Sequence, residues 1–246
     1  VFMASRTAGN IDQVLEEILD YQVDGIILAS VAMSSSLAIR CDEAGIPVVL
    51  FNRNQADLGV CSVTSDNVLG GRKLAQFLAA AGHQNIGYIA GWDGASTQHD
   101  REAGFVAGLQ EAGLALFARQ CGNFVLEDAH KAAHEMFRQR VIPDAVFVAN
   151  DFMAFAVMDV LRFELGLSIP GDVSVVGYDD VQLASWASYD LTTVRQPLNK
   201  MVGEVIAMLM ARIEHGDTKL RNEALDGPLI VRGSAKIPKG WKHEGF

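Results

Sequence analysis

Residues 169–180 read IPGDVSVVGYDD, and this stretch decides the fold. Pro170-Gly171 is a turn signal that cannot continue a helix. The run from Val173 to Val176 is short and rich in valine, which is typical of a strand buried on both faces. Gly177 is expected to break this run, and Asp179 and Asp180 follow at once. Because ligands of open parallel sheets bind outside the carboxyl ends of the strands, these carboxylates are expected at the lip of a cleft. The alternative is an ordinary helix or turn cap.

The composition limits the class of protein. The chain has 246 residues, half of them hydrophobic, and a formal net charge of −10. No run approaches the ~20 apolar residues of a membrane span, so we expect a soluble globular protein without membrane contact. The negative charge argues against nucleic-acid binding by this chain itself. Cys41, Cys61 and Cys121 lie far apart and match no metal spacing, so they are interpreted as core thiols in the reducing cytoplasm. No metal and no cofactor is expected.

Strand and helix patterns alternate along the whole chain, which predicts an α/β fold of parallel sheets with helices on both faces. The strands are too many for one small doubly wound sheet, so two similar halves are expected, with a first crossing near 64–66. Residues 91–100 are expected to form a polar loop. The predicted strands are 1–4, 25–29, 47–51, 61–64, 86–90, 118–121, 145–149, 173–176, 193–195 and 229–231. The predicted helices begin at Asn10, Ser34, Asn67, Arg101, Ala129, Phe152 and Pro197.

Polar or aromatic residues follow most of these strands. Amides and carboxylates can bind hydroxyl groups with paired hydrogen bonds, an aromatic face can pack on a sugar or a base, and arginine offers five donors in a rigid fork. Each residue also has a simpler interpretation, as a turn residue, a helix cap, an ion-pair partner or part of the core. As a set at equivalent positions, they favour a ligand site. The residues are Asn52-Arg53, Thr97, Arg101, Phe124, Asn150-Asp151 and Asp179-Asp180.

Five segments together resemble the lactose/galactose repressor family of bacterial transcription regulators, in the family's order and over nearly the whole chain. They are 23–27 (VDGII), 82–91 (GHQNIGYIAG), 100–105 (DREAGF), 169–180 (IPGDVSVVGYDD) and 191–197 (LTTVRQP). The resemblance implies a periplasmic-binding-protein-like fold, in which two doubly wound parallel-sheet lobes are joined by three crossovers and an effector binds in the cleft between the lobes. Residues 1–65 plus 197–226 would form the N-terminal lobe, and residues 66–196 plus 227–246 the C-terminal lobe.

The resemblance also implies a role for individual residues. Asp179 and Arg101 match the family's ligand-binding aspartate and arginine. The other matches are Asn150 and Asn52 as polar effector contacts, with Asn52 in place of a frequent aspartate, Phe124 as an aromatic that stacks on the effector, Thr97 as a hydroxyl contact and Gln196 beside the crossover. The effector would be a small molecule, most simply a sugar or sugar derivative.

The chain departs from the family at its beginning. The helix-turn-helix head, through which operator DNA would be bound, is absent, and so are the family's first core strand and helix. We therefore expect either that this sequence is incomplete relative to the folded protein or that the first lobe is disturbed. The helix from Phe152 to Leu161 is apolar nearly all round, which suggests a homodimer with this helix near the two-fold axis.

Two other classes of protein compete with a regulator. A periplasmic sugar-binding protein of a transporter would have the same fold. An enzyme is disfavoured because the chain has no G-x-S-x-G, no phosphate-binding glycine loop after a strand and no metal spacing, so no catalytic residue is expected. His83 is interpreted as structural.

Overall fold

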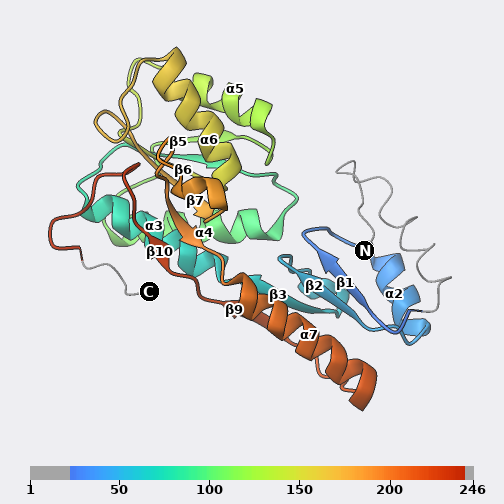
Figure 1. The fold of residues 1–246 in the computed structure, drawn as a ribbon. Helices are drawn as coiled ribbons and strands as arrows, with labels where there is room; N and C mark the ends of the chain where they lie inside the picture. The colour runs from blue at the N-terminus through green and yellow to red at the C-terminus, as the bar shows by residue number, and fades with distance from the viewer. Residues whose placement is uncertain (1–22, 242–246) are drawn as a thin grey trace. The chain divides into compact units, whose positions relative to one another are not determined.

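The computed structural model describes residues 23–241, so the predicted strand at 1–4 and the helix from Asn10 lie outside the described residues. The chain divides into two compact units (Figure 1). Unit 1 contains the described residues up to Thr64 together with Leu198–Leu225. Unit 2 contains Ser65–Pro197 together with the described residues from Asp226. The chain therefore passes between the units three times.

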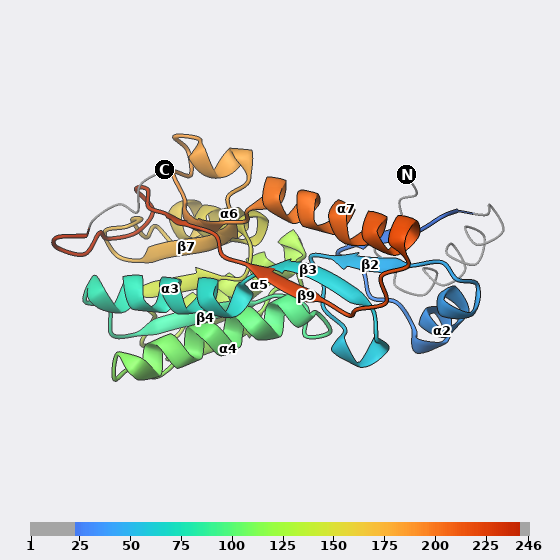
Figure 2. The ribbon, with the colours of Figure 1, turned by 90° about the horizontal axis from the view of Figure 1, so that it is seen from below.

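Unit 1 is a sheet with a helix on each face. Among the described residues the strand order is β1 (Ile26–Ala29), β2 (Val48–Phe51), β3 (Cys61–Ser65) and β9 (Asn222–Leu225), and β1, β2 and β3 run parallel. Successive β2 residues alternate between the faces, because Val48 and Leu50 pack with α2 (Ser35–Glu43) while Val49 packs with α7 (Leu198–His215). Figure 2 shows α2 and α7 on opposite sides of β2. The 3₁₀ turn η1 (Ala56–Leu58) precedes β3.

Unit 2 is a doubly wound sheet. Among the described residues its strand order is β10 (Leu229–Ile230), β8 (Thr192–Arg195), β7 (Ser174–Asp179), β6 (Ala145–Val148), β4 (Ile86–Ala90) and β5 (Ala118–Cys121). Figure 1 shows α3 (Asn67–Ala80) and α4 (Ser96–Glu111) on one face, and α5 (Leu126–Phe137) and α6 (Asp151–Asp159) on the other. The rings of Tyr88, Phe105 and Phe147, with centroids 4.9 to 5.8 Å apart, fill the core between β4, β6 and α4. The short helix η3 (Gln182–Ser185) follows β7.

The α/β class with two parallel-sheet lobes is confirmed, but β10 pairs antiparallel with β8, where the β-α alternation predicts a parallel strand. Gly177 does not end its strand either, because β7 continues through it to Asp179. A Cβ at Gly177 would lie 2.4 Å from Asp151 Oδ1. The glycine therefore admits the start of α6 against the strand, and Asp179 is the last strand residue rather than part of a following loop.

Two helices of unit 2 begin several residues earlier than predicted. α4 begins at Ser96 rather than Arg101, and α5 at Leu126 rather than Ala129. The buried side chain of Gln98 explains the first difference, because its Oε1 accepts hydrogen bonds from Gly91 N (2.6 Å) and Tyr88 Oη (2.8 Å). Residues 96–100 therefore form a polar first turn that is bonded to the strand end, and the loop after β4 is short.

Helix α6 does not have the open apolar face that suggested its place at a dimer axis. One side covers β7, and the other packs against α5. The ring of Phe155 also lies 4.2 Å from that of Tyr189, between centroids. Phe152, at 49% exposure, is the one large apolar side chain of Asp151–Asp159 that is well exposed. The apolar character of α6 is thus satisfied within unit 2 and does not argue for a second subunit. None of the helices between residues 23 and 241 combines the length and apolar composition of a bilayer span.

Candidate functional site

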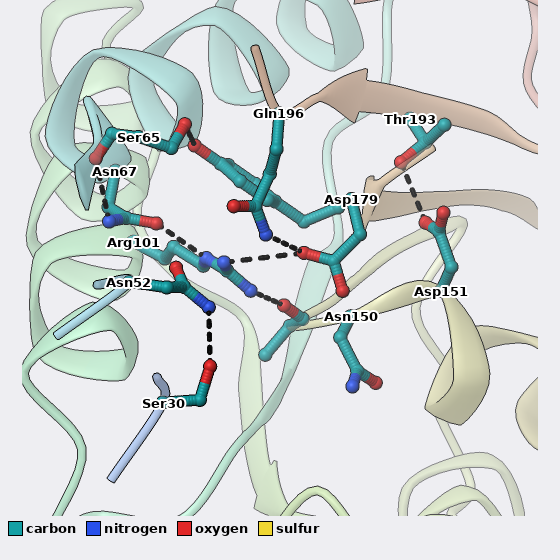
Figure 3. Close-up of polar contacts among 12 residues, drawn as sticks. Ser30, Asn52, Ser65, Asn67, Arg101, Asn150, Asp151, Asp179, Thr193 and Gln196 are labelled. Carbon is teal, nitrogen blue, oxygen red and sulfur yellow. Dashed lines mark hydrogen bonds and ion pairs between the residues drawn. The ribbon is translucent and has the colours of Figure 1, made fainter. Parts of the chain in front are cut away.

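Arg101 is the centre of a buried polar cluster in unit 2 (Figure 3). Its side chain is 3% exposed. The guanidinium donates from Nε to Asn67 Oδ1 (2.8 Å), from Nη1 to Ala149 O (2.5 Å) and from Nη2 to Asp179 Oδ1 (3.4 Å). It also lies 3.8 Å above the centroid of the Tyr178 ring, in cation–π geometry. Because these partners follow or belong to three different strands, the guanidinium is held in one orientation.

Asp179 and Gln196 extend this cluster. Gln196 directly follows β8, and its Nε2 donates to Asp179 Oδ1 over 2.6 Å. The buried Gln196 Oε1 has no hydrogen-bond partner among the described residues, and no bond of Asp179 Oδ2 is seen within them. Burial raises the pKa of Asp179, and Arg101 and Gln196 oppose that rise. The cluster therefore presents two unsatisfied acceptor oxygens beside a fixed cation.

The backbone that carries Asp179 is strained. Asp179 and Asp180 have φ of +126° and +57°, and such conformations of non-glycine residues cost about 1–3 kcal/mol each. Two ion pairs of 2.6 Å, from Arg195 and Arg232 to the Asp180 carboxylate, hold the turn in place. Because these ion pairs hold the strained backbone in one conformation, the direction of the Asp179 side chain is fixed.

The Asp151 side chain stabilises the turn that follows β7. Its carboxylate is fully buried and accepts hydrogen bonds from Val181 N (2.9 Å) and Thr193 Oγ1 (2.7 Å). Burial, with a smaller contribution from the nearby Asp179 charge, raises the pKa of Asp151 to about 7. The preceding residue, Asn150, caps α6, because its Oδ1 accepts from Met153 N (2.9 Å).

We expect Asp151→Asn to remove a pH dependence of stability. An acid with a raised pKa binds its proton more tightly in the folded state, so wild-type stability is highest below the ordinary aspartate pKa of 3.8 and falls as the pH rises to about 7. Between pH 5 and pH 8 this loss is about 3 kcal/mol. Asparagine can accept from Val181 N and donate to Thr193 Oγ1, so the fold is kept. Urea denaturation at both pH values measures the difference. An unchanged pH slope in the variant would contradict this assignment.

Glycines bring the two helices of the cluster together. A Cβ at Gly71 of α3 would lie 2.2 Å from Arg101 O, and a Cβ at Gly104 of α4 would lie 1.9 Å from Val68 O. The backbones of α3 and α4 are therefore in direct contact near the start of both helices. This contact sets Asn67, the first residue of α3, within hydrogen-bond reach of Arg101.

Thr97 and Phe124 also lie in unit 2. Thr97 is buried in the first turn of α4. Phe124 is half-buried and has φ of +57°. Its ring lies against Gly91, where a Cβ would come within 2.1 Å of a ring carbon. A glycine at the end of β4 is therefore needed for the ring to take this place.

Asn52 belongs to unit 1. It follows β2 with φ of +56°, and its Nδ2 donates to Ser30 Oγ, which follows β1, over 3.1 Å. The buried Oδ1 of Asn52 has no hydrogen-bond partner among the described residues. Arg53 donates from Nη2 to Ser30 O (3.0 Å), which agrees with a structural rather than a ligand-binding interpretation of Arg53.

Of the predicted site residues, the structure brings Arg101, Asp179 and Gln196 into direct hydrogen-bond contact. Asn67 and Tyr178 are equally close to Arg101, and the sequence did not point to them. Asn67 follows β3 as the other polar residues follow their strands, so the same positional rule applies to it. Its place directly after Asp66, which caps α3 through a bond from Leu69 N, favours a capping interpretation instead. No sequence signal marks Tyr178, a buried strand residue.

The fold and this cluster define a periplasmic binding protein-like domain, and the model of that family matches residues 75–235. The chain is 35% identical over 216 residues to the HTH-type transcriptional regulator CelR of Thermobifida fusca, covering 86% of this chain and 63% of that protein. It is 32% identical over 224 residues to the HTH-type transcriptional repressor PurR of Photorhabdus laumondii, covering 85% and 65%. This chain thus spans less than two thirds of the length of either relative.

Comparison with solved structures leads to the same class of protein. A complex of the transcriptional regulator CelR with cellobiose superimposes with a TM-score of 0.84 at 33% identity, covering 92% of this chain and 71% of that one. A LacI-family regulator of Enterococcus faecium with bound ribose gives a TM-score of 0.83 at 25% identity, covering 92% and 84%. This chain belongs to the LacI family of transcriptional regulators, and the resemblance predicted from five sequence segments is confirmed.

Proposed function

We propose that this chain is the effector-sensing region of a DNA-binding transcriptional regulator and that it binds a sugar or sugar derivative. The observation that carries the proposal is the rigid Arg101–Asp179–Gln196 cluster with its unsatisfied acceptor oxygens. Asn52, Thr97, Phe124 and Asn150 are proposed as further effector contacts. Of these, the unpaired Oδ1 of Asn52 and the constrained ring of Phe124 have the most direct support.

The chemistry of the cluster suits neighbouring hydroxyl groups. A hydroxyl both donates and accepts a hydrogen bond, so it pairs best with one acceptor and one donor. Asp179 Oδ2 and Gln196 Oε1 can accept. Arginine has five N–H donors, and the bonds described for Arg101 use three of them, which leaves two for a ligand. Two adjacent hydroxyls of a sugar ring match this set, and the complexes of related regulators with cellobiose and ribose support the same class of effector.

The regulatory step is proposed to be a change of population. An effector can alter operator binding only through the difference between its affinities for two forms of the protein. The DNA itself would be bound by a helix-turn-helix head, as the names of the relatives describe, since the chain carries a net charge of −10. We further propose a cytoplasmic homodimer, because a two-fold symmetric regulator suits palindromic operators.

The two rival classes are less well supported. The relatives reported above are transcriptional regulators, so a periplasmic binding protein of a transporter is not favoured. The same relatives are not enzymes, which supports the expectation that the chain binds its ligand without turnover.

A thermal-shift screen tests the proposed function. The purified protein is heated with mono- and disaccharides, sugar acids, nucleosides and purine bases. We expect one sugar or sugar derivative, at about 100 times its Kd, to raise the Tm by roughly 5–10 °C, because binding to the native state alone stabilises it by about 2.7 kcal/mol. The same compound should change operator binding by the full-length regulator in a gel-shift assay. A shift by a base or nucleoside alone would contradict the sugar class.

A further inference from the structure

A second polar cluster lies on the face of unit 2 formed by α5 and α6, which are side by side in Figure 1. His130 Nε2 is 2.7 Å from Glu164 Oε1, and His134 Nε2 is 2.9 Å from Glu164 Oε2. The two imidazole centroids are 4.8 Å apart. One potential ligand atom of each residue lies within 4.8 Å of the others. None of the three residues belongs to the Arg101 cluster.

Local structure brings the three side chains together. His130 and His134 are four residues apart on α5, so they share one helix face. An adjoining face of α5 is anchored in the core by Ala129, Ala133 and Met136. Glu164 ends the π turn η2 (Val160–Glu164), in which Leu165 N donates to Val160 O. Such widened turns occur often at functional sites, and this one holds the carboxylate opposite both imidazoles.

The two imidazoles converge on one carboxylate. His130 Nε2 and His134 Nε2 each face a different oxygen of Glu164, so the three side chains surround a common point. A neutral imidazole nitrogen and an ionised carboxylate are the forms that coordinate a metal ion. A bound ion would therefore replace the present contacts between the two Nε2 atoms and the carboxylate.

We propose that His130, His134 and Glu164 form a binding site for a late first-row divalent metal ion, with Zn²⁺ as the best match. Zn²⁺ binds imidazole nitrogen and carboxylate oxygen at about 2.0–2.2 Å, commonly with three protein ligands and a water. For a tetrahedral ion at about 2.1 Å, the ligand atoms stand roughly 3.4 Å apart. The present N···O separations of 2.7 and 2.9 Å open to that value by a shift below 1 Å. His130 and Glu164 are 45% exposed, so their side chains have room to adjust.

The bound ion would join α5 to the end of the helix that continues from α6. These segments belong to the same unit, so the site is independent of how the two units are arranged. It also does not depend on the proposed effector, because the residues of the two clusters are different. The two proposals can therefore fail separately.

Calorimetric titration of the tag-free protein with Zn²⁺, in buffer free of chelators, tests the site. We expect one Zn²⁺ per chain, and a rise in Tm of several degrees when free Zn²⁺ is about 100 times the Kd. His130→Ala and Glu164→Gln should each weaken Zn²⁺ binding at least tenfold. Glu164→Gln keeps the shape of the side chain and loses only the charge. His215→Ala, at the exposed end of α7, is the matched control and should bind Zn²⁺ as the wild type does.

The visible absorption of bound Co²⁺ provides a second readout. We expect an intense tetrahedral or five-coordinate spectrum that Glu164→Gln alters and His215→Ala does not. Melting of the metal-free variants shows whether each is folded, and both substitutions are at half-exposed positions. The proposal is wrong if the wild type shows no saturable Zn²⁺ binding, or if folded His130→Ala and Glu164→Gln proteins bind Zn²⁺ with unchanged affinity.

Discussion

Asp179→Asn is expected to weaken effector binding by roughly 100-fold and to leave the protein folded. The substitution turns the open Oδ2 acceptor into an amide donor, so a ligand hydroxyl that donates to Asp179 loses its partner. A hydrogen bond to a charged group contributes about 1.5–3 kcal/mol, and the upper value corresponds to this loss. Isothermal titration with the effector found in the screen measures it.

Stability should respond differently from binding in this variant. The Oδ1 of asparagine can still accept from Arg101 and Gln196. The pKa of Asp179 is raised, which means that the folded protein disfavours its charged form. Removing that charge offsets the lost ion pair with Arg101, so the free energy of unfolding should change by less than about 2 kcal/mol. Asp179→Asn would thus weaken effector binding strongly and change the free energy of unfolding little.

Glu111→Gln is the matched control for Asp179→Asn. Glu111 ends α4, is half-exposed and pairs with Arg72 over 3.5 Å, so its loss of charge should leave the affinity unchanged. Normal effector affinity in folded Asp179→Asn would refute the proposed site, whereas equal losses in both variants would point to a general electrostatic effect.

Gly104→Ala is expected to have the largest effect on stability, with a loss of about 3 kcal/mol. The new Cβ would lie 1.9 Å from Val68 O, and neither helix backbone can yield locally. α3 and α4 must therefore separate, and overpacking of this kind costs about 1–3 kcal/mol or more. The separation also pulls Asn67 from Arg101, so effector affinity should fall with stability. Urea denaturation and titration of the same sample measure both.

Gly203→Ala is the control for this prediction. Gly203 lies inside α7, and a Cβ there would meet no atom within 4 Å. Alanine has the higher helix propensity, so this variant should gain about 0.4–1 kcal/mol. If Gly104→Ala were as stable as Gly203→Ala, close contact of α3 and α4 would not be what positions Arg101.

Most of the fold could be predicted from the sequence, because buried strands leave short apolar runs and helices leave an apolar stripe. The exposed edge strand β9 (Asn222–Leu225) leaves neither signal and was missed. The antiparallel direction of β10 was also not predictable, since a two-residue strand carries no mark of direction. The early start of α4 depends on Gln98 bonding to the strand end, which is a tertiary contact.

The candidate site, too, could be predicted only in part from the sequence. Polar residues at strand ends identify Asp179, Asn150 and Asn52 by position, and the family resemblance adds roles that position alone cannot supply. The contacts of Arg101 with Asn67 and Tyr178 could not be predicted. The contact with Asn67 depends on the close packing of α3 and α4 at glycines, and the contact with Tyr178 depends on the placing of its ring against the guanidinium. Gly71 and Gly104 are visible in the sequence, but nothing in it shows which two helices they bring together.

The close contact of α3 and α4 has a consequence for redesigning the protein as a biosensor. Arg101 presents its guanidinium to the polar cluster and its carbonyl to Gly71, so it contributes both to the proposed effector site and to the contact between the two helices. Libraries that vary Gly71 or Gly104, where a Cβ would collide with backbone atoms of the other helix, would mostly yield misfolded clones. Diversity is better placed at Gln196, which belongs to the cluster without bridging α3 and α4, and at Phe124, another proposed effector contact, so that a new specificity could be selected without disturbing the packing of the two helices.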